Sequence, residues 1–252
     1  MKDYSNYESD VFSCTYEGQT AVICLKSESF RMGMDSSLMR DLLECFNAIE
    51  VVQDIKGVLM LHTATYERVE VLKEFIQSIQ KESGYVKKEM CVTRFGNTVK
   101  RLTLALNNFS KPSVVGILGQ VPIDSFGYYL ACDYRVASDD LSIEFPGLKI
   151  GVTPAGAASF FMKRQMGATK TQQLLTTGKS LSAEEAKELC MVSEIVPREQ
   201  IKAAGLTQLE EFYKIPGSTL NYTKQLVRPR THELEEHFEL CSRLMWNSII
   251  DN

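Results

Sequence analysis

Two short, continuous apolar runs, separated by longer segments of helical period, constrain the fold of this chain more than any other feature. The runs cover residues 57–62 and 113–118. A run of this length is typical of a strand buried on both faces of a parallel sheet. Between the runs, apolar residues at helical spacing predict helices over residues 70–82 and 93–109. Strands that alternate with helices indicate βαβ units, and therefore an α/β fold with a largely parallel sheet.

The segments on either side extend this pattern. Residues 11–16 and 20–25 alternate apolar and polar side chains around a short polar turn, which predicts a β-hairpin. Apolar residues at helical spacing predict a helix over residues 38–49.

From about residue 155 the pattern becomes helical, and Ser182 and Glu185 have the spacing of a capping box. Pro197 then separates two predicted regions. We expect a core over residues 1–197 and a C-terminal helical segment over residues 198–252.

Charge and composition exclude several classes of protein. The 252 residues carry a net charge of −4, which argues against a nucleic-acid partner. No run of ~18 apolar residues predicts a membrane span. The polar first residues lack the apolar stretch of a secretion signal, so a cytoplasmic location is expected. Seven scattered cysteines form no CxxC pair and no cluster with histidine, which predicts reduced thiols and no metal site.

The most specific motifs are two segments in the middle of the chain. Residues 119–133 read GQVPIDSFGYYLACD, and residues 145–154 read FPGLKIGVTP. Together they resemble the central signature of the enoyl-CoA hydratase/isomerase (crotonase) superfamily, whose segments usually read like NGxxxGGGxELAxxCD and QPExxxGxxPxxG. The likeness covers roughly residues 11–200, more loosely to about 248. Further anchors are Lys111-Pro112, residues 131–137, Leu174-Leu175-x-x-Gly178, residues 183–192 and residues 194–197.

The resemblance implies a fold and an assembly. The superfamily core is a spiral of ββα repeats, and its C-terminal helices mediate trimers or dimers of trimers. The segment over residues 220–250 fits such a role, because it carries more apolar surface than a peripheral helix of a monomer leaves exposed. We therefore expect a homotrimer or hexamer assembled through Leu226, Val227, Leu234, Phe238, Leu240, Leu244, Met245 and Trp246.

This chain departs from the superfamily at its two catalytic glutamates. Aligned on Cys132-Asp133, the first glutamate falls on Gly127; aligned on Gly151, the second falls on Gly147. Hydration of an enoyl thioester needs a carboxylate pair to position a water molecule and move its proton. Glycine can do neither, so the sequence predicts no ordinary enoyl-CoA hydratase activity.

The resemblance also locates two backbone amides that would form an oxyanion hole. One belongs to Asp124, inside Ile123-Asp124-Ser125, which replaces the glycine run of the superfamily. The other falls near Glu70, after a loop about three residues shorter than usual. An amide survives in any residue type except proline, so this function does not depend on the missing carboxylates.

Four residues are candidates for altered chemistry: Asp124, Tyr66, Glu67 and Glu144. Asp124 falls beside the expected thioester carbonyl, although capping of a helix is the alternative, since aspartate is favoured there. Tyr66 and Glu67 follow a strand end, where site residues are common. Glu144 is either a displaced catalytic carboxylate or a solvated strand residue.

Other residues near these motifs are expected to be structural. His62 is interpreted as a satisfied structural histidine, and Tyr128 or Tyr129 as filling the space of a lost glutamate side chain. His232 and His237 are expected on the surface.

One branch of the superfamily lacks both glutamates as well. It consists of polyketide decarboxylases that act on carrier-protein thioesters, and its GFTPGMGAT motif is similar to residues 151–158. Those enzymes keep the glycine run that this chain has lost, so the likeness indicates kinship rather than a shared activity.

The ligand implied by the resemblance is an acyl thioester, carried by CoA or by the phosphopantetheine of an acyl carrier protein, with no other cofactor. Lys26, Arg31, Lys224 and Arg228 are candidate contacts for the CoA phosphates. Two functions follow. The first is a crotonase-fold enzyme that decarboxylates or isomerises an acyl thioester through its oxyanion hole; the alternative is a non-catalytic homologue that serves as a thioester-binding or assembly subunit.

Overall fold

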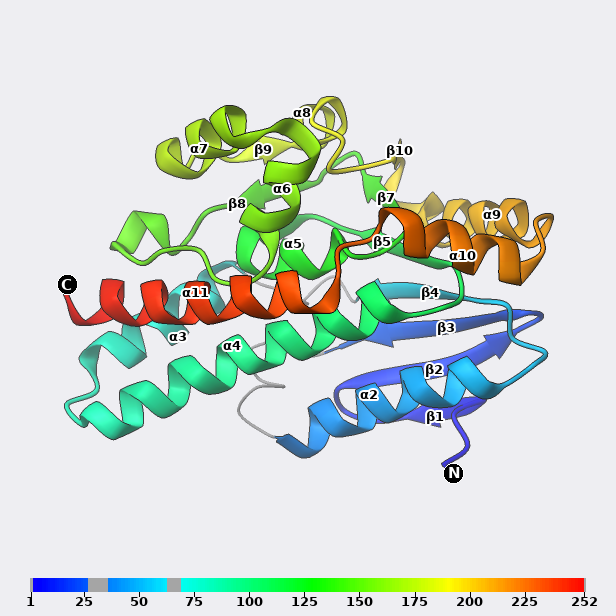
Figure 1. Ribbon diagram of the computed structural model, residues 1–252, viewed down its shortest axis with the longest axis horizontal. Helices are drawn as coiled ribbons and strands as arrows, with labels where there is room; N and C mark the ends of the chain where they lie inside the picture. Colours follow the sequence, from blue (N-terminus) through cyan, green and yellow to red (C-terminus); the bar gives the residue numbers. More distant parts are fainter. Residues whose placement is uncertain (1, 27–35, 63–68, 252) are drawn as a thin grey trace.

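A seven-stranded sheet runs through the molecule (Figure 1). The computed structural model describes residues 2–26, 36–62 and 69–251. The strand order is β1-β2-β3-β4-β5-β7-β10, and every pair from β3 to β10 is parallel. The strands are β1 (Asn6–Glu8), β2 (Phe12–Glu17), β3 (Thr20–Leu25), β4 (Gly57–His62), β5 (Ser113–Ile117), β7 (Tyr134–Ser138) and β10 (Glu194–Val196).

A second, three-stranded sheet lies beside the first. Its order is β6-β8-β9, and β6 follows β5 directly, as β8 follows β7. In two successive turns, β5-β6 and β7-β8, the chain contributes one strand to each sheet before the next α-helix, as the ββα spiral implied by the resemblance requires. The strands of this sheet are β6 (Gln120–Pro122), β8 (Ser142–Glu144) and β9 (Leu181–Ser182).

Helices cover the two sheets and form the C-terminal region. The long helices α4 and α11 lie side by side (Figure 1). No helix among the described residues is long and apolar enough to cross a membrane. The helices are α2 (Ser36–Val51), α3 (Val69–Lys81), α4 (Tyr85–Asn108), α5 (Ile123–Tyr129), α6 (Ala158–Met166), α7 (Ala168–Thr177), α8 (Ala183–Glu188), α9 (Ile201–Tyr213), α10 (Gly217–Val227) and α11 (Thr231–Ile250), with 3-10 turns at Leu148–Ile150 and Arg198–Gln200.

Most local predictions are confirmed. The predicted hairpin is β2 and β3, paired antiparallel from Phe12 with Leu25 to Glu17 with Thr20. The capping box at the start of α8 is present, with Ser182 and Glu185 bonding to each other's backbone amides. The predicted start of the helix over residues 93–109 is wrong, because α4 begins at Tyr85. Its first two turns expose several apolar side chains, so they lack the one-sided pattern on which the prediction rested.

Lys111, which precedes Pro112 and β5, links this strand to the end of α2. Its ammonium group donates hydrogen bonds to the backbone carbonyls of Ile49, Val52 and Ile55, at 2.6, 2.7 and 2.6 Å. These carbonyls lie at the end of α2 and in the turn after it, where helical acceptors lack backbone partners. Burial lowers the pKa of Lys111. The side chain thus fastens the end of α2 to the start of the next strand.

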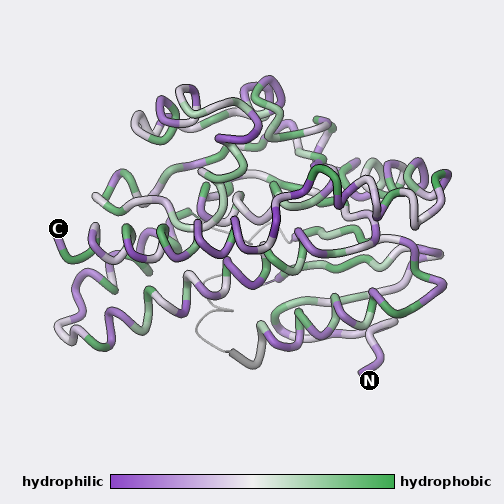
Figure 2. The backbone as a smooth tube through the Cα atoms, in the orientation of Figure 1, coloured by the Kyte–Doolittle hydropathy of each residue, from purple (hydrophilic) through white to green (hydrophobic). Residues whose placement is uncertain are grey.

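Helix α9 closes one face of the large sheet. Ile201 and Leu209 of this helix are buried in a cluster with Leu59 and Val114 of the sheet. Figure 2 shows hydrophobic residues along these strands and alternating hydrophobic and hydrophilic residues along the helices. The approach is close: a Cβ at Gly116 would lie 2.4 Å from Ile201 Cγ2. The first helix of the predicted C-terminal segment therefore packs directly on the core.

The substitution Gly116→Ala should destabilise the protein by ~1–3 kcal/mol, because the added methyl group overlaps Ile201 in a packed core. Gly217→Ala is the matched control, since a Cβ there has no neighbour within 4 Å among the described residues. Urea denaturation of both variants measures the difference. Equal midpoints would contradict the close docking of α9.

Candidate functional site

Asp124 lies in the first turn of α5, directly after β6. The N-cap of α5 is Pro122, so the interpretation of Asp124 as a helix cap is wrong. Its carboxylate instead accepts a hydrogen bond from the backbone amide of Ala155, with 2.6 Å between Asp124 Oδ1 and Ala155 N. Only 2% of Asp124 is exposed. The side chain thus joins α5 to the loop that precedes α6.

That loop packs closely against α5 from Ala155 to the start of α6. Gly156 has a φ of +84°, a conformation that favours glycine, and a Cβ there would lie 2.7 Å from the carbonyl oxygen of Asp124. Ala157 and Ala158, which follow, are completely or almost completely buried. Only small residues allow the two backbones to approach this closely.

Gly127, the first vacated glutamate position, faces the start of α6. A Cβ at Gly127 would lie 2.6 Å from the backbone nitrogen of Ala158 and 2.9 Å from that of Ala157. Contacts this short are not found for real side chains, and backbone atoms cannot turn aside as a flexible side chain can. Glycine carries no carboxylate, and the main chain of Ala157 and Ala158 fills the place from which a side chain would extend.

Gly147, the second vacated position, is closed in a similar way. Its carbonyl oxygen accepts hydrogen bonds from the amides of Ile150 and Val152, at 3.0 and 2.8 Å. A Cβ at Gly147 would lie 2.9 Å from the carbonyl oxygen of Val152. Gly147 thus belongs to a tight backbone turn, whereas Gly127 lies within α5.

Helix α11 contacts residues 153–159, which are the loop before α6 and the first residues of α6. Ser248 Oγ accepts a hydrogen bond from the amide of Thr153 at 3.2 Å, and the thiol of Cys241 donates to the carbonyl of Gly156 at 3.5 Å. Nε2 of His237 lies 3.2 Å from Ser159 Oγ and 3.2 Å from Cys241 Sγ.

These contacts correct the expectation for one histidine. His237 is half-buried rather than on the surface, whereas His232 is exposed. Burial lowers the pKa of His237 and raises the pKa of the Cys241 thiol to about 11. The pair is therefore neutral near pH 7, and it fixes the loop instead of presenting a thiolate.

Aromatic rings fill the interior beside α5. Tyr128 and Tyr129 are completely buried, with ring centroids 4.5 Å apart. His62 stacks on Tyr129, with centroids 6.1 Å apart, and its Nε2 accepts a hydrogen bond from the amide of Leu118 at 3.1 Å. This arrangement agrees with the structural interpretation of His62.

Glu144 lies on the three-stranded sheet, where it pairs with Pro122 just before α5. Its carboxylate accepts hydrogen bonds from Ser142 Oγ at 2.8 Å and Ser180 Oγ at 2.6 Å, and Lys149 Nζ lies 3.4 Å away. Burial alone would raise the pKa of Glu144, but the hydrogen bonds and the lysine charge hold it below its usual range. These hydrogen bonds link Glu144 to its neighbours in the sheet, and a carboxylate with a lowered pKa is a poor proton acceptor.

The remaining candidates are divided between described and undescribed segments. Tyr66, Glu67 and Arg31 lie outside the described residues. Glu70 is exposed in the first turn of α3, where backbone amides have no acceptor within the helix. The amide of Asp124 has the same position in α5. Both predicted oxyanion amides thus belong to the first turns of helices.

The basic side chains proposed for CoA phosphates are engaged by the protein. Lys26 pairs with Glu8, and Arg228 donates to the carbonyl of Asn107 at 3.2 Å. Lys224 Nζ lies 2.7 Å from Asp133 Oδ2 and 2.7 Å from the carbonyl oxygen of Lys111. These contacts serve the fold.

Comparison with known proteins identifies the same architecture. The crystal structure of enoyl-CoA hydratase from Bacillus halodurans superposes with a TM-score of 0.78 at 19% identity, over 94% of each chain. An enoyl-CoA hydratase from Polaromonas gives a TM-score of 0.70 at 17% identity, over 96% of this chain and 91% of that one. These likenesses define the class of fold.

The family follows from the sequence. The profile of the enoyl-CoA hydratase/isomerase family matches residues 17–251, so the chain belongs to that family. A Thermus thermophilus protein described as a proposed enoyl-CoA hydratase is 24% identical over 214 residues, which is 84% of this chain and 81% of that protein.

If Asp124 joins α5 to the loop before α6, Asp124→Ala should cost ~1–3 kcal/mol of stability, because the buried amide of Ala155 loses its acceptor. Asp124→Asn keeps an oxygen at the same place and should cost clearly less. Thermal and urea unfolding of the two variants provide the comparison. The assignment fails if alanine and asparagine are equally tolerated.

Proposed function

We propose that this member of the enoyl-CoA hydratase/isomerase family binds an acyl thioester and does not hydrate it. The observation that carries the proposal is the 2.6 Å separation between a Cβ built on Gly127 and the backbone nitrogen of Ala158. Hydration needs a carboxylate to activate water. Here the main chain occupies the place from which that carboxylate would extend.

Chemistry that needs only an oxyanion hole remains open to this site. Decarboxylation of a malonyl-type (2-carboxyacyl) thioester releases carbon dioxide and leaves an enolate, whose oxygen is stabilised by backbone amides without any carboxylate of the protein. The first turns of α3 and α5 supply such amides at Glu70 and Asp124. Isomerisation requires a base as well, and Asp124 is buried, so decarboxylation suits the described groups better. Tyr66 and Glu67 remain candidate participants.

A specific observation supports the second candidate, a non-catalytic thioester-binding or assembly subunit. His62, Asp124 and Tyr129 are each less than 5% exposed, so these three side chains present almost no surface to a substrate. Glu144 is committed to its own sheet. A protein of this kind would bind the thioester or a carrier-protein partner without turnover.

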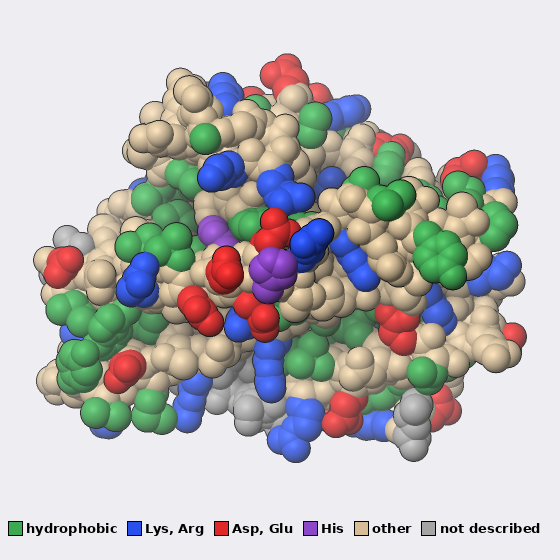
Figure 3. Space-filling model, in the orientation of Figure 1, with side chains coloured by type: hydrophobic (Ala, Val, Ile, Leu, Met, Phe, Trp, Pro, Cys, Tyr) green, Lys and Arg blue, Asp and Glu red, His purple; other side chains and the backbone are tan. Residues whose placement is uncertain are grey.

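We also propose that the protein is a homotrimer or hexamer in a reducing compartment such as the cytoplasm. Leu234, Phe238 and Met245, which the sequence predicts for the interface, are instead buried in the chain's own core, and Trp246 is half-buried against it. Figure 3 shows hydrophobic side chains gathered where α4 begins and α11 ends. Apolar residues that remain exposed for an interface include Leu226, Val227, Leu240 and Leu244 on α10 and α11, and Tyr85, Val86 and Met90 on α4.

The purified protein should bind an acyl-CoA in calorimetry yet show no hydration of crotonyl-CoA. Gly127→Glu should not create hydration, because the new side chain cannot be placed without moving the start of α6. A circular dichroism spectrum of the variant shows whether it folds. Hydration at ~10 per second, a typical enzyme rate, by either protein would refute the proposal.

Malonyl-CoA, a 2-carboxyacyl thioester, separates the two candidates. Release of carbon dioxide by the purified protein supports the decarboxylase. Binding without release supports the non-catalytic subunit. If neither malonyl-CoA nor crotonyl-CoA binds, the thioester assignment itself is wrong.

A further inference from the structure

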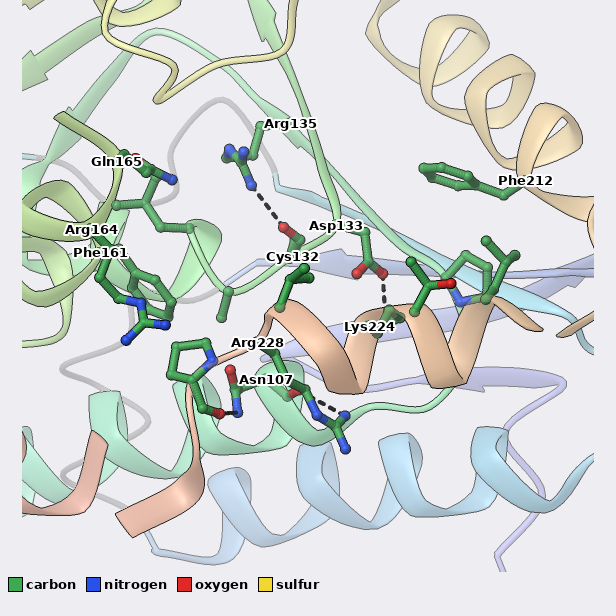
Figure 4. Close-up of a pocket in the computed structure, with 17 residues that line it drawn as sticks. Asn107, Cys132, Asp133, Arg135, Phe161, Arg164, Gln165, Phe212, Lys224 and Arg228 are labelled. Carbon is green, nitrogen blue, oxygen red and sulfur yellow. Dashed lines mark hydrogen bonds and ion pairs between the residues drawn. The ribbon is translucent and has the colours of Figure 1, made fainter. Parts of the chain in front are cut away.

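A cavity of about 560 Å³ lies at the opposite end of α5 from Asp124. Its walls come from the turn after α5, from α6 and from α10 (Figure 4). The helix has 7 residues, so at 1.5 Å per residue the cavity is separated from the amino end of α5 by about 10 Å. The size falls within the range of small-molecule sites. The cavity is therefore a separate place from the proposed thioester site.

The charge on the cavity wall is opposite to that of the whole protein. Its lining contains Arg135, Arg164, Lys224 and Arg228, with Asp133 as the single acidic side chain. The chain as a whole carries a net charge of −4. This local excess of positive charge does not follow from composition, and it favours an anionic ligand.

Arg135 is the residue best placed to hold the anion. Its Nε donates to the carbonyl of Met191 at 2.8 Å, and its Nη1 donates to the carbonyl of Cys132 at 2.7 Å (Figure 4). Among the residues the structure describes, no acceptor is recorded for Nη2, and no carboxylate forms an ion pair with this guanidinium. Burial lowers the pKa of Arg135. The side chain is half-buried, and Asp133 is near enough to act on its charge without forming an ion pair, so a bound anion would add a direct partner.

The other cations differ from Arg135 in this respect. Lys224 is paired with Asp133 at 2.7 Å. Arg164 lies at the wall formed by α6, 3.6 Å from Glu233, and its side chain is 47% exposed. Arg228 donates to the carbonyl of Asn107. They add positive potential around the site, whereas Arg135 supplies a directed and incompletely used donor.

The uncharged part of the wall is mixed, with polar side chains at Asn107, Gln165 and Thr223. Its accessible apolar side chains are Phe212 and Leu220, which are half-buried, and Val227, with 72% of its surface accessible. A ligand that fills this space therefore needs an apolar body as well as an acid group. Guanidinium groups bind carboxylates in a planar, paired geometry.

We propose that this cavity binds an amphipathic carboxylate, with its acid group on Arg135 and its hydrocarbon chain against Phe212, Leu220 and Val227. None of these four residues is a candidate for the thioester site, whereas Lys224 and Arg228, expected from the sequence to contact the CoA phosphates, also line this cavity. The ligand class is a hydrocarbon-chain acid of the kind represented by decanoate.

Calorimetric titration with decanoate tests the class of ligand. Decanol has the same chain without the charge, and inorganic phosphate has a charge without the chain. Decanoate should bind, and each of the other two should bind at least about tenfold more weakly, because each lacks one half of the recognition. Failure of decanoate to bind, or equal binding of decanol, overturns the proposal.

A matched pair of variants tests the place. Val227→Glu puts a negative charge on the cavity wall and should weaken decanoate binding by about tenfold or more. Tyr222→Glu makes the same kind of change elsewhere on α10, at a position that is 66% exposed and does not line the cavity, and should leave the affinity within about twofold. Both sites are on the surface, so both variants should fold.

Arg135→Lys tests the anchor, since it keeps the charge and removes the planar fork. It should weaken decanoate binding by about tenfold, with Arg243→Gln, an exposed position on α11, as the unaffected control. Light scattering on each variant checks the assembly. If Val227→Glu dissociates an oligomer while the parent does not bind decanoate, a second copy of the chain occupies the cavity and the proposal is wrong.

Discussion

The contact between α5 and the loop before α6 is the constraint on which the centre of this structure depends. Asp124 bonds to the amide of Ala155, and the first residues of α6 lie against Gly127. Helix α11 then closes the same loop through Ser248 and Cys241. Three segments far apart in the sequence are joined at one place. The absence of a side chain at residue 127 is what permits them to meet.

Several residues of the family motifs prove to serve this architecture rather than a reaction. Lys111 binds the carbonyls at the end of α2. Asp133 accepts hydrogen bonds from the amide and hydroxyl of Ser113, at 2.8 and 2.9 Å, and pairs with Lys224. These residues are buried or half-buried links between strands and helices. A sequence can keep them all and still lose the groups that perform chemistry, because the links and the reactive groups are different residues.

The sequence predicts the elements of this fold well, since they follow from local periodicity. The buried strands β4 and β5 and the hairpin of β2 and β3 are visible as apolar runs and as alternation. The start of α4 is not, because its first turns expose apolar side chains. Nor is the docking of α9 on the sheet, which depends on contacts with Leu59 and Val114 across more than eighty residues of chain.

The candidate site likewise combines features that can be predicted from the sequence with contacts that cannot. Alignment with the family motifs identifies Gly127 and Gly147 as vacated positions and places Asp124 at the start of a helix. It does not reveal that Asp124 bonds to Ala155, because that contact joins residues 31 apart in the sequence. One signal was available: the run of small residues from Ala155 to Ala158 is suited to close packing of two backbones.

The closed position at Gly127 also bears on how this protein can be redesigned. The main chain of Ala157 and Ala158 occupies the space beside this glycine, and α11 contacts the same loop. A side chain at residue 127 requires a compensating shift of α6, so redesign of this region has to change the two segments together.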